Sequence, residues 1–351
     1  MEKSLRFSKT ASWLFAGMIF ILALEIGLRI AGWHQTFSEK YGDPYSSLFG
    51  TIDKTWYHTY RPGEVRTDGG DEFSFSFKAN NEGFLDSDFS THKDSGTFRI
   101  LILGDSFVQG IGVRQDKSFP EQLEILLKTY FNISPKIEVY NCGIGNSDPI
   151  FQYKLLFDRL LKYKPDLVID VINGTDINDI TIRGGFERFK PDGTLKYSDP
   201  PGFEPVYAHS YIARTVVHEV LRYNWMFLKP SEEADANANS LDQIKMTVYR
   251  MDSLCYTKSV SFLLITHPLR YELRPNSSYA ISTVNDFCNE ERITNINIKD
   301  YFDAKHIDAS TAEAFYWPKD GHFKKIGYKL MADISAGAVI EAIYRKEDDK
   351  E

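Results

Sequence analysis

The chain has 351 residues, 42% of them hydrophobic and 14% aromatic, so it can bury a sizeable core and is neither disordered nor fibrous. Its formal net charge is -8 without a long basic run, which argues against a nucleic-acid partner because phosphate binding needs clustered Lys and Arg. The three cysteines show no zinc-site spacing, and their odd number favours unpaired thiols over a single Cys255–Cys288 disulfide.

The chain begins with a basic tail over residues 1–10, which contains Lys3, Arg6 and Lys9. The apolar segment that follows, residues 11–33, would be about 34 Å long as a helix at roughly 1.5 Å per residue, enough to cross a hydrocarbon core about 30 Å thick. Glu25 and Arg29 lie one helical turn apart near its far end, where they can pair.

This pattern predicts a single-pass signal anchor in the cytoplasmic (inner) membrane, with the basic tail inside and the rest of the chain on the periplasmic or extracellular side. A cleaved signal peptide is the alternative, because the uninterrupted apolar core covers only residues 11–24. No small-x-small cleavage site follows that core, which favours the uncleaved anchor. Both alternatives export the rest of the chain.

Residues 34–97 are polar and rich in turn-forming residues, and we interpret them as a lead-in segment. One stretch alternates, because Phe73, Phe75 and Phe77 fall on the same side of an extended chain. We expect one short strand there.

From residue 98 to about residue 345, short apolar runs alternate with amphipathic segments. Strands are expected at 98–103, 137–141, 166–172, 259–266 and 294–298. Helices are expected at 120–131, 151–163, 241–256, 279–290 and 325–344. Such alternation implies parallel strands joined by right-handed crossovers, and hence an α/β sandwich.

Residues 183–240 interrupt this alternation, and we interpret them as an insertion. They contain an apolar and aromatic helix expected over 207–228, followed by a polar stretch, PSEEADANANS, that we expect to be mobile. A surface elaboration explains the insertion, and a lid or acceptor-binding element is the functional alternative, because loops carry specificity in such folds.

Ser106 directly follows the first strand of the alternating region. In an open parallel sheet, reactive groups gather in the loops at the carboxyl ends of the strands. A serine there can act as a nucleophile, and its own N–H can face a developing oxyanion. A capping serine in an ordinary strand-to-helix turn is the alternative. The nucleophile elbow G-x-S-x-G is excluded because Val108 occupies its last position.

Two further loops at strand ends carry glycine or polar residues. After the second strand, the N–H of Gly145 could supply an oxyanion donor, although turn geometry would also explain this glycine. After the third strand come Thr175 and Asn178, and a side chain of this loop could donate a further hydrogen bond. We place Asp105, next to Ser106, in the same oxyanion or substrate-binding set.

Asp320 and His322 lie two residues apart just before the last helix. In extended backbone, residues i and i+2 point the same way, so the carboxylate can reach the imidazole and fix its tautomer. A lone loop histidine is more often a surface residue. Here an orienting acid precedes it and a candidate nucleophile exists elsewhere, which favours His322 as a base.

Together these loops resemble the GDSL/SGNH hydrolase superfamily over most of residues 80–335. The blocks that carry the resemblance are NNEGFLD, RILILGDSFVQGIGV, NCGIGNSD, KPDLVIDVINGTDIND and DGHFKKIGYKLMAD, in the family's order. The anchor ending in LEIGLRI is similar to the membrane-bound bacterial branch. The resemblance implies a flavodoxin-like three-layer sandwich with a central parallel sheet. It also implies Ser106 as nucleophile, His322 as base, Asp320 as its acid, and the amides of Ser106 and Gly145 as oxyanion donors.

The sequence departs from the family's pattern at two places. Thr175 stands where the family usually has its oxyanion asparagine, and Asn173 or Asn178 could substitute for it. Losing one oxyanion donor typically costs about 10² to 10³ in rate. The acid, Asp320, precedes the histidine by two residues, whereas the usual spacing is three.

The resemblance predicts hydrolysis of an O-acyl ester of an envelope carbohydrate or lipid, through an acyl-enzyme and without a metal or organic cofactor. Transfer of the acyl group to a glycan is an alternative that shares the acyl-enzyme step. A third hypothesis, motivated by Thr175, is a non-catalytic glycan-binding protein that keeps the fold.

Overall fold

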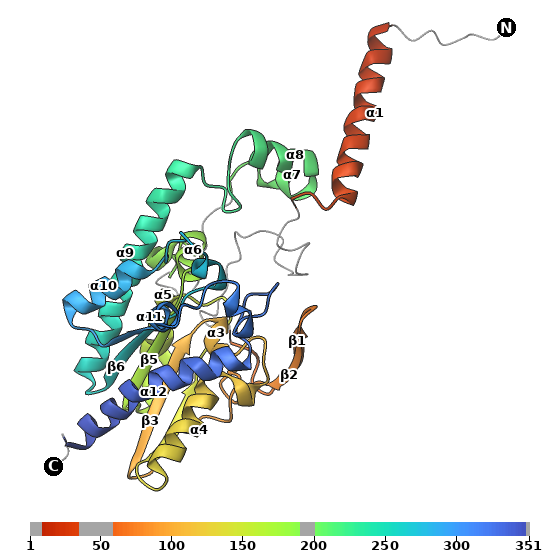
Figure 1. The fold of residues 1–351 in the computed structure, drawn as a ribbon. Helices are drawn as coiled ribbons and strands as arrows, with labels where there is room; N and C mark the ends of the chain where they lie inside the picture. Colours follow the sequence, from red (N-terminus) through yellow and green to blue (C-terminus); the bar gives the residue numbers. More distant parts are fainter. Residues whose placement is uncertain (1–8, 35–58, 190–200, 349–351) are drawn as a thin grey trace. The chain divides into compact units, whose positions relative to one another are not determined.

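The computed structural model describes residues 9–34, 59–189 and 201–348, which are drawn as ribbon in Figure 1. These residues fall into two compact units. The larger unit holds the described residues 59–181, 185–187 and 237–348, and the smaller one holds 9–34, 182–184, 188–189 and 201–236. Most of the predicted basic tail and residues 35–58 of the lead-in segment lie outside the described residues.

Five parallel strands form the sheet of the larger unit, in the order β4-β3-β5-β6-β7. Their bounds are Thr97–Gly104 (β3), Lys136–Asn141 (β4), Leu167–Ile172 (β5), Ser261–Thr266 (β6) and Asn295–Asn297 (β7). With the first of these strands in second position, this is the flavodoxin-like order. The predicted α/β sandwich with a central parallel sheet is confirmed.

Helices cover both faces of this sheet. The helices of the larger unit are α3 (Ser106–Gln109), α4 (Phe119–Phe131), α5 (Pro149–Leu155), α6 (Thr175–Arg183), α9 (Pro230–Thr257), α10 (Ser282–Glu291), α11 (Ile298–Ala304) and α12 (Lys325–Asp348). The last residues of α6 and the first residues of α9 belong to the smaller unit. Ile100 and Ile102 of β3 share one buried cluster with Leu123 of α4 and Val339 of α12. The connections from β4 to β5, from β5 to β6 and from β6 to β7 run along the sheet in the direction opposite to the connection from β3 to β4. Because crossovers of parallel strands are right-handed, this places α5, α9 and α10 on the other face of the sheet.

The lead-in segment contributes a hairpin in place of the single strand that was expected. Strands β1 (Val65–Gly69) and β2 (Ser74–Lys78) pair antiparallel. Phe75 and Phe77 are buried on one side of β2, as the alternation predicted, and they pack with Leu85. The turn between the strands carries Glu72.

The insertion differs from its prediction in two respects. The polar stretch expected to be mobile forms the first turns of α9, which begins at Pro230. Glu232 and Glu233 lie in that first turn, where negative charge stabilises a helix N-terminus. The expected helix over 207–228 is broken into α7 (Glu204–His209), α8 (Tyr211–Thr215) and a π-helical turn over Val216–Val220, because Ser210 caps α8.

Helix α1 (Lys9–Ile30) has 22 residues, none of them buried, and lies in the smaller unit. It is the one helix among the described residues that is long and apolar enough to cross a membrane. The three cysteines, Cys142, Cys255 and Cys288, are buried and unpaired.

Candidate active site

The candidate site lies where β3, β4 and β5 end, because parallel strands bring their carboxyl ends to one edge of the sheet. Gly104, the last residue of β3, pairs in register with Val171 of β5, and Ile102 pairs with Asn141 at the end of β4. The loops that carry Ser106, Gly145 and Thr175 are therefore neighbours in space, as the sequence predicted.

Ser106 is the first residue of the short helix α3. The carboxylate of Asp105 caps this helix by accepting a hydrogen bond from the N–H of Phe107 at 2.8 Å. The N–H of Ser106 has no acceptor within its own helix, because the first amides of a helix lack intrahelical partners. Gly110, at φ 93°, ends the helix after one turn. This geometry leaves the Ser106 side chain partly exposed at the sheet edge.

His322 joins Ser106 to Asp320. Its Nε2 lies 2.7 Å from the Oγ of Ser106, and its Nδ1 lies 2.6 Å from the Oδ1 of Asp320. With Nδ1 carrying the proton toward Asp320, Nε2 is free to accept from the serine hydroxyl. The expected contacts are present, and the imidazole and carboxylate side chains are only 22% and 33% exposed.

The route by which Asp320 reaches His322 differs from the extended backbone that was assumed. Gly321 adopts φ 91°, and Oδ1 of Asp320 also accepts from the N–H of His322 at 3.1 Å, so the three residues form a tight turn. Partial burial raises the pKa of Asp320, but hydrogen bonds from His322 outweigh it and leave that pKa below its usual value. The carboxylate stays ionised beside the imidazole.

The lead-in hairpin holds the loop that carries this pair. Oε2 of Glu72 accepts from the N–H groups of Lys319 and Asp320 at 2.9 and 2.7 Å. The ring of Phe73 lies 5.4 Å from that of Trp317, and Trp317 donates from Nε1 to the carbonyl of Gly112 at 3.1 Å. Glu72 was missed from the sequence, because an acidic residue in a polar turn carries no local signal of a partner 248 positions away.

The amide of Gly145 lies near the nucleophile but is already hydrogen-bonded. It donates to Oε1 of Gln109, and Nε2 of that side chain donates to the hydroxyl of Tyr60 at 2.9 Å. A Cβ added to Gly145 would lie 4.0 Å from the Cβ of Ser106. A substrate oxyanion can use this amide only after the Gln109 oxygen moves away.

The Thr175 and Asn173 side chains of the third loop are likewise hydrogen-bonded within the protein. The hydroxyl of Thr175 donates to Oδ1 of Asn173 at 2.8 Å, and Nδ2 of Asn173 donates to Oδ2 of Asp105 at 2.8 Å. Asn178 lies further along α6, and its side chain makes no hydrogen bond to another described residue. Asp105 was expected in the oxyanion or substrate-binding set. Its side chain is instead buried and supports the turn that carries Ser106.

Three buried carboxyl groups lie beneath the nucleophile turn. Burial raises the pKa of Asp105, and raises those of Asp170 and Asp176 well above their usual value. Neither oxygen of Asp170 has a hydrogen-bond partner among the described residues. Asp170 was missed from the sequence, because it lies inside a strand that is otherwise apolar.

His267, fully buried, packs against the residue that follows the nucleophile. Its ring lies 4.3 Å from that of Phe107 and 5.3 Å from that of Phe323. Burial lowers the pKa of His267 to about 4, so the imidazole is neutral at pH 7. This residue, too, was missed from the sequence.

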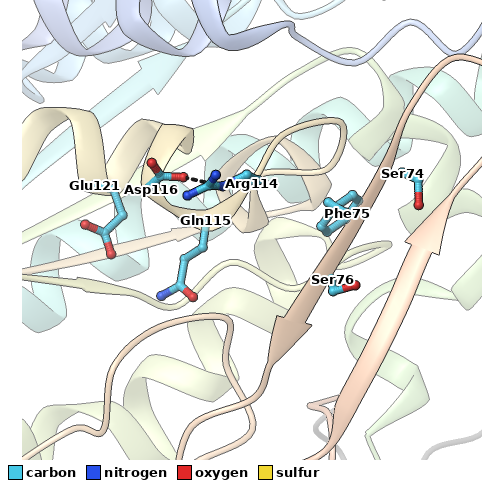
Figure 2. Close-up of a pocket in the computed structure, with 7 residues that line it drawn as sticks. All are labelled: Ser74, Phe75, Ser76, Arg114, Gln115, Asp116 and Glu121. Carbon is cyan, nitrogen blue, oxygen red and sulfur yellow. Dashed lines mark ion pairs between the residues drawn. The ribbon is translucent and has the colours of Figure 1, made fainter.

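A surface hollow beside β2 does not belong to this site. It is lined by Ser74, Phe75, Ser76, Arg114, Gln115, Asp116 and Glu121 (Figure 2). An ion pair of 3.2 Å joins Arg114 to Asp116 at its wall. Neither Ser106 nor His322 lines it. No group of three or more His, Cys, Asp or Glu residues in the described parts of the chain could hold a metal ion.

No protein-family model matches the sequence, and no curated protein matches it. Similar solved structures include the acetyl xylan esterase AlAXEase, at 15% identity and a TM-score of 0.43 over 69% of this chain and 100% of the other. A lipase/acylhydrolase from Enterococcus faecalis is similar at 13% identity and a TM-score of 0.41, over 69% and 95%. A protein assigned to the G-D-S-L lipolytic family, from Desulfitobacterium hafniense, gives 16% and 0.40 over 68% and 97%.

Proposed function

We propose that this protein is a membrane-anchored serine esterase of the SGNH type that cleaves O-acyl esters of a carbohydrate or lipid outside the cytoplasmic membrane. The observation that carries the proposal is the chain of contacts from Ser106 through His322 to Asp320, at 2.7 and 2.6 Å. Three residues of these types in this order have the geometry of an activated nucleophile, its base and the acid that orients the base.

The reaction follows from these positions. Oγ of Ser106 attacks the ester carbonyl while Nε2 of His322 takes the hydroxyl proton, and Asp320 stabilises the imidazolium. The leaving alcohol takes that proton, and an acyl-enzyme ester remains on Ser106. A water molecule activated by His322 then attacks the acyl group and releases the carboxylic acid.

The N–H of Ser106 and the N–H of Gly145 are the donors proposed for the oxyanion. The second donor becomes available once the side chain of Gln109 leaves it. That requirement favours a second candidate, a glycan-binding protein that keeps the fold without catalysis, because the amide of Gly145 is occupied.

Location outside the membrane rests on α1. Its 22 residues reach about 33 Å at roughly 1.5 Å per residue, which suffices to cross the hydrocarbon core. Basic residues precede α1, and such residues stay on the cytoplasmic side.

Labelling by a fluorophosphonate probe tests the proposal. We expect the full-length protein in detergent to label, Ser106→Ala not to label, and Ser278→Ala, a change at an exposed serine, to label normally. Absence of labelling in the unmodified protein would favour the glycan-binding candidate. Acyl turnover measured with and without a sugar acceptor distinguishes an esterase from an O-acyltransferase. Only a transferase is accelerated by the acceptor and yields an acylated sugar.

A further inference from the structure

The outer end of α1 is bound to the helices of the insertion through Glu25. Oε1 of Glu25 accepts from the N–H of Tyr211 at 2.9 Å, and Oε2 accepts from the N–H of Ile212 at 2.9 Å. Oε2 also accepts from the hydroxyl of Ser210 at 3.0 Å. A carboxylate of the anchor helix thus satisfies amides that the first turn of α8 would otherwise leave without partners.

Arg29, one turn further along α1, completes this contact. Its guanidinium donates to the carbonyl of His209 at 3.1 Å, lies 4.9 Å from the ring of Tyr211, and pairs with Glu25 at 3.4 Å. Both charged residues of the apolar segment are therefore used by the insertion. A polar group in a membrane segment needs such partners, because unpaired charge in hydrocarbon is costly.

The position of Glu25 along α1 sets the depth of this contact. Glu25 lies 16 residues after Lys9, or about 24 Å along the helix, whereas the hydrocarbon core is about 30 Å thick. With the basic end of α1 at the inner boundary, Glu25 lies about 6 Å inside the outer boundary of the hydrocarbon core. Residues bound to Glu25 must then lie at that depth.

Residues 204–228, which we call the headpiece, present the surface that this depth requires. Large apolar side chains are exposed on it, namely Val206, Val216, Val220, Leu221 and Trp225. Val220 is 68% exposed and Trp225 is 49% exposed. Tryptophan is enriched at the membrane interface, and Trp33, just beyond α1, is also exposed.

We propose that the headpiece is seated in the outer membrane interface, with these apolar side chains against lipid, and that Glu25 holds it there. The inference rests on the proposed membrane-spanning role of α1. It gives the insertion a lipid-binding role in place of the lid or surface elaboration considered from the sequence. Lipid is favoured over a protein partner because Glu25 and Arg29 of the anchor helix contact residues 209–212 of the headpiece directly.

The test uses the full-length protein in phosphatidylethanolamine and phosphatidylglycerol nanodiscs with a thiol-reactive fluorophore at Val220→Cys and quencher-bearing lipids. Ile26→Cys on α1 reports insertion of the anchor, and Asp235→Cys, at an exposed position of the smaller unit outside the headpiece, is the control. The native cysteines are buried, and their background is measured without an added thiol. We expect strong quenching at positions 26 and 220, and at least about twofold weaker quenching at 235.

Quenching at 26 without quenching at 220 would overturn the headpiece inference and leave the anchor in place. Absence of quenching at positions 26 and 220 would overturn both the headpiece inference and the membrane-spanning role of α1. A second pair of variants tests the role of the carboxylate: Glu25→Leu should lower quenching at 220 at least about twofold, whereas Glu25→Gln, which keeps an acceptor oxygen, should lower it less. Equal quenching in all three proteins would show that Glu25 does not seat the headpiece. Fluorophosphonate labelling of Ser106 is measured separately, so failure of the esterase proposal is recognised independently.

Discussion

The side-chain oxygen of Gln109 accepts the backbone N–H of Gly145 beside the nucleophile. Gln109 is buried, and its amide nitrogen is held by Tyr60 from the lead-in segment. An oxyanion donor proposed for the reaction is thus already hydrogen-bonded to an acceptor of the protein itself.

Two substitutions at Gln109 should have different effects on the kcat/KM of ester hydrolysis. Gln109→Glu should lower kcat/KM by about 10² or more, because a carboxylate binds the Gly145 amide more strongly and repels the oxyanion. Gln109→Met, similar in shape without the acceptor, should keep kcat/KM at or above the starting value. Thermal unfolding checks that both variants fold. Equal losses in both would mean that Gln109 acts only through packing.

Replacing members of the catalytic chain should give unequal losses. His322→Ala removes the base and should reduce kcat by about 10⁶, whereas Asp320→Asn keeps the imidazole and should cost about 10⁴. Single-turnover kinetics with an activated ester measure both. An equal or greater loss in Asp320→Asn would reverse the roles assigned to the two residues.

Glu72 should act on the rate through the loop it holds. Glu72→Ala removes the acceptor of two loop amides, so we expect kcat to fall about tenfold with little change in KM, because the imidazole is displaced from Ser106. Glu72→Gln keeps an acceptor oxygen and should recover most of the rate. Asp71→Asn is the matched control, since Asp71 is an exposed neighbour that pairs only loosely with Lys319 at 3.7 Å. A kcat for Glu72→Ala that equals that of Asp71→Asn would remove Glu72 from the site.

His267 should make stability depend on pH. Its pKa is about 4 in the folded protein and 6.5 in the unfolded chain, so between these values the unfolded state binds more protons. The contribution of His267 to the free energy of unfolding is fully present above pH 6.5 and is lost as pH falls toward 4. The total loss is about 3 kcal/mol. His267→Asn, which keeps a donor toward Pro268, should flatten the slope of unfolding free energy against pH in this window. Urea unfolding at pH 4.5, 5.5 and 7 measures it, and an unchanged slope would contradict the buried neutral imidazole.

Gly143 should tolerate no side chain. A Cβ there would lie 2.3 Å from the N of Gln109 and 2.6 Å from the C of Val108, which are backbone atoms of the helix that begins with Ser106. Gly143→Ala should therefore lower both the melting temperature and fluorophosphonate labelling. Gly337→Ala on α12 is the control, since no atom lies within 4 Å of its added Cβ, and it should stabilise by about 0.5 to 1 kcal/mol. Normal labelling in Gly143→Ala would show that α3 adapts freely.

The sequence by itself determined the sheet and the order of the residues around it. Strand-length apolar runs between amphipathic helices are local patterns, and they placed β3, β5 and β6 correctly to within a few residues. Parallel strands all end at one edge, so the order of strands and loops alone predicts that Ser106 and Gly145 lie near one another. The polar start of α9 was misread, because residues 230–240 show no apolar periodicity and their helical state depends on being continuous with the packed part of the helix.

Only the tertiary structure decided which polar groups meet. Gln109 reaches Gly145, Glu72 reaches the amide of Asp320, and Glu25 reaches the amide of Tyr211. The sequence around each of these side chains is that of an ordinary polar residue. A hydrogen bond between distant positions does not change the hydrophobic periodicity of either segment. Periodicity records which face of an element is buried, whereas the partner of a single carboxylate or amide is fixed only when the folded backbone brings one free donor within about 3 Å of one acceptor.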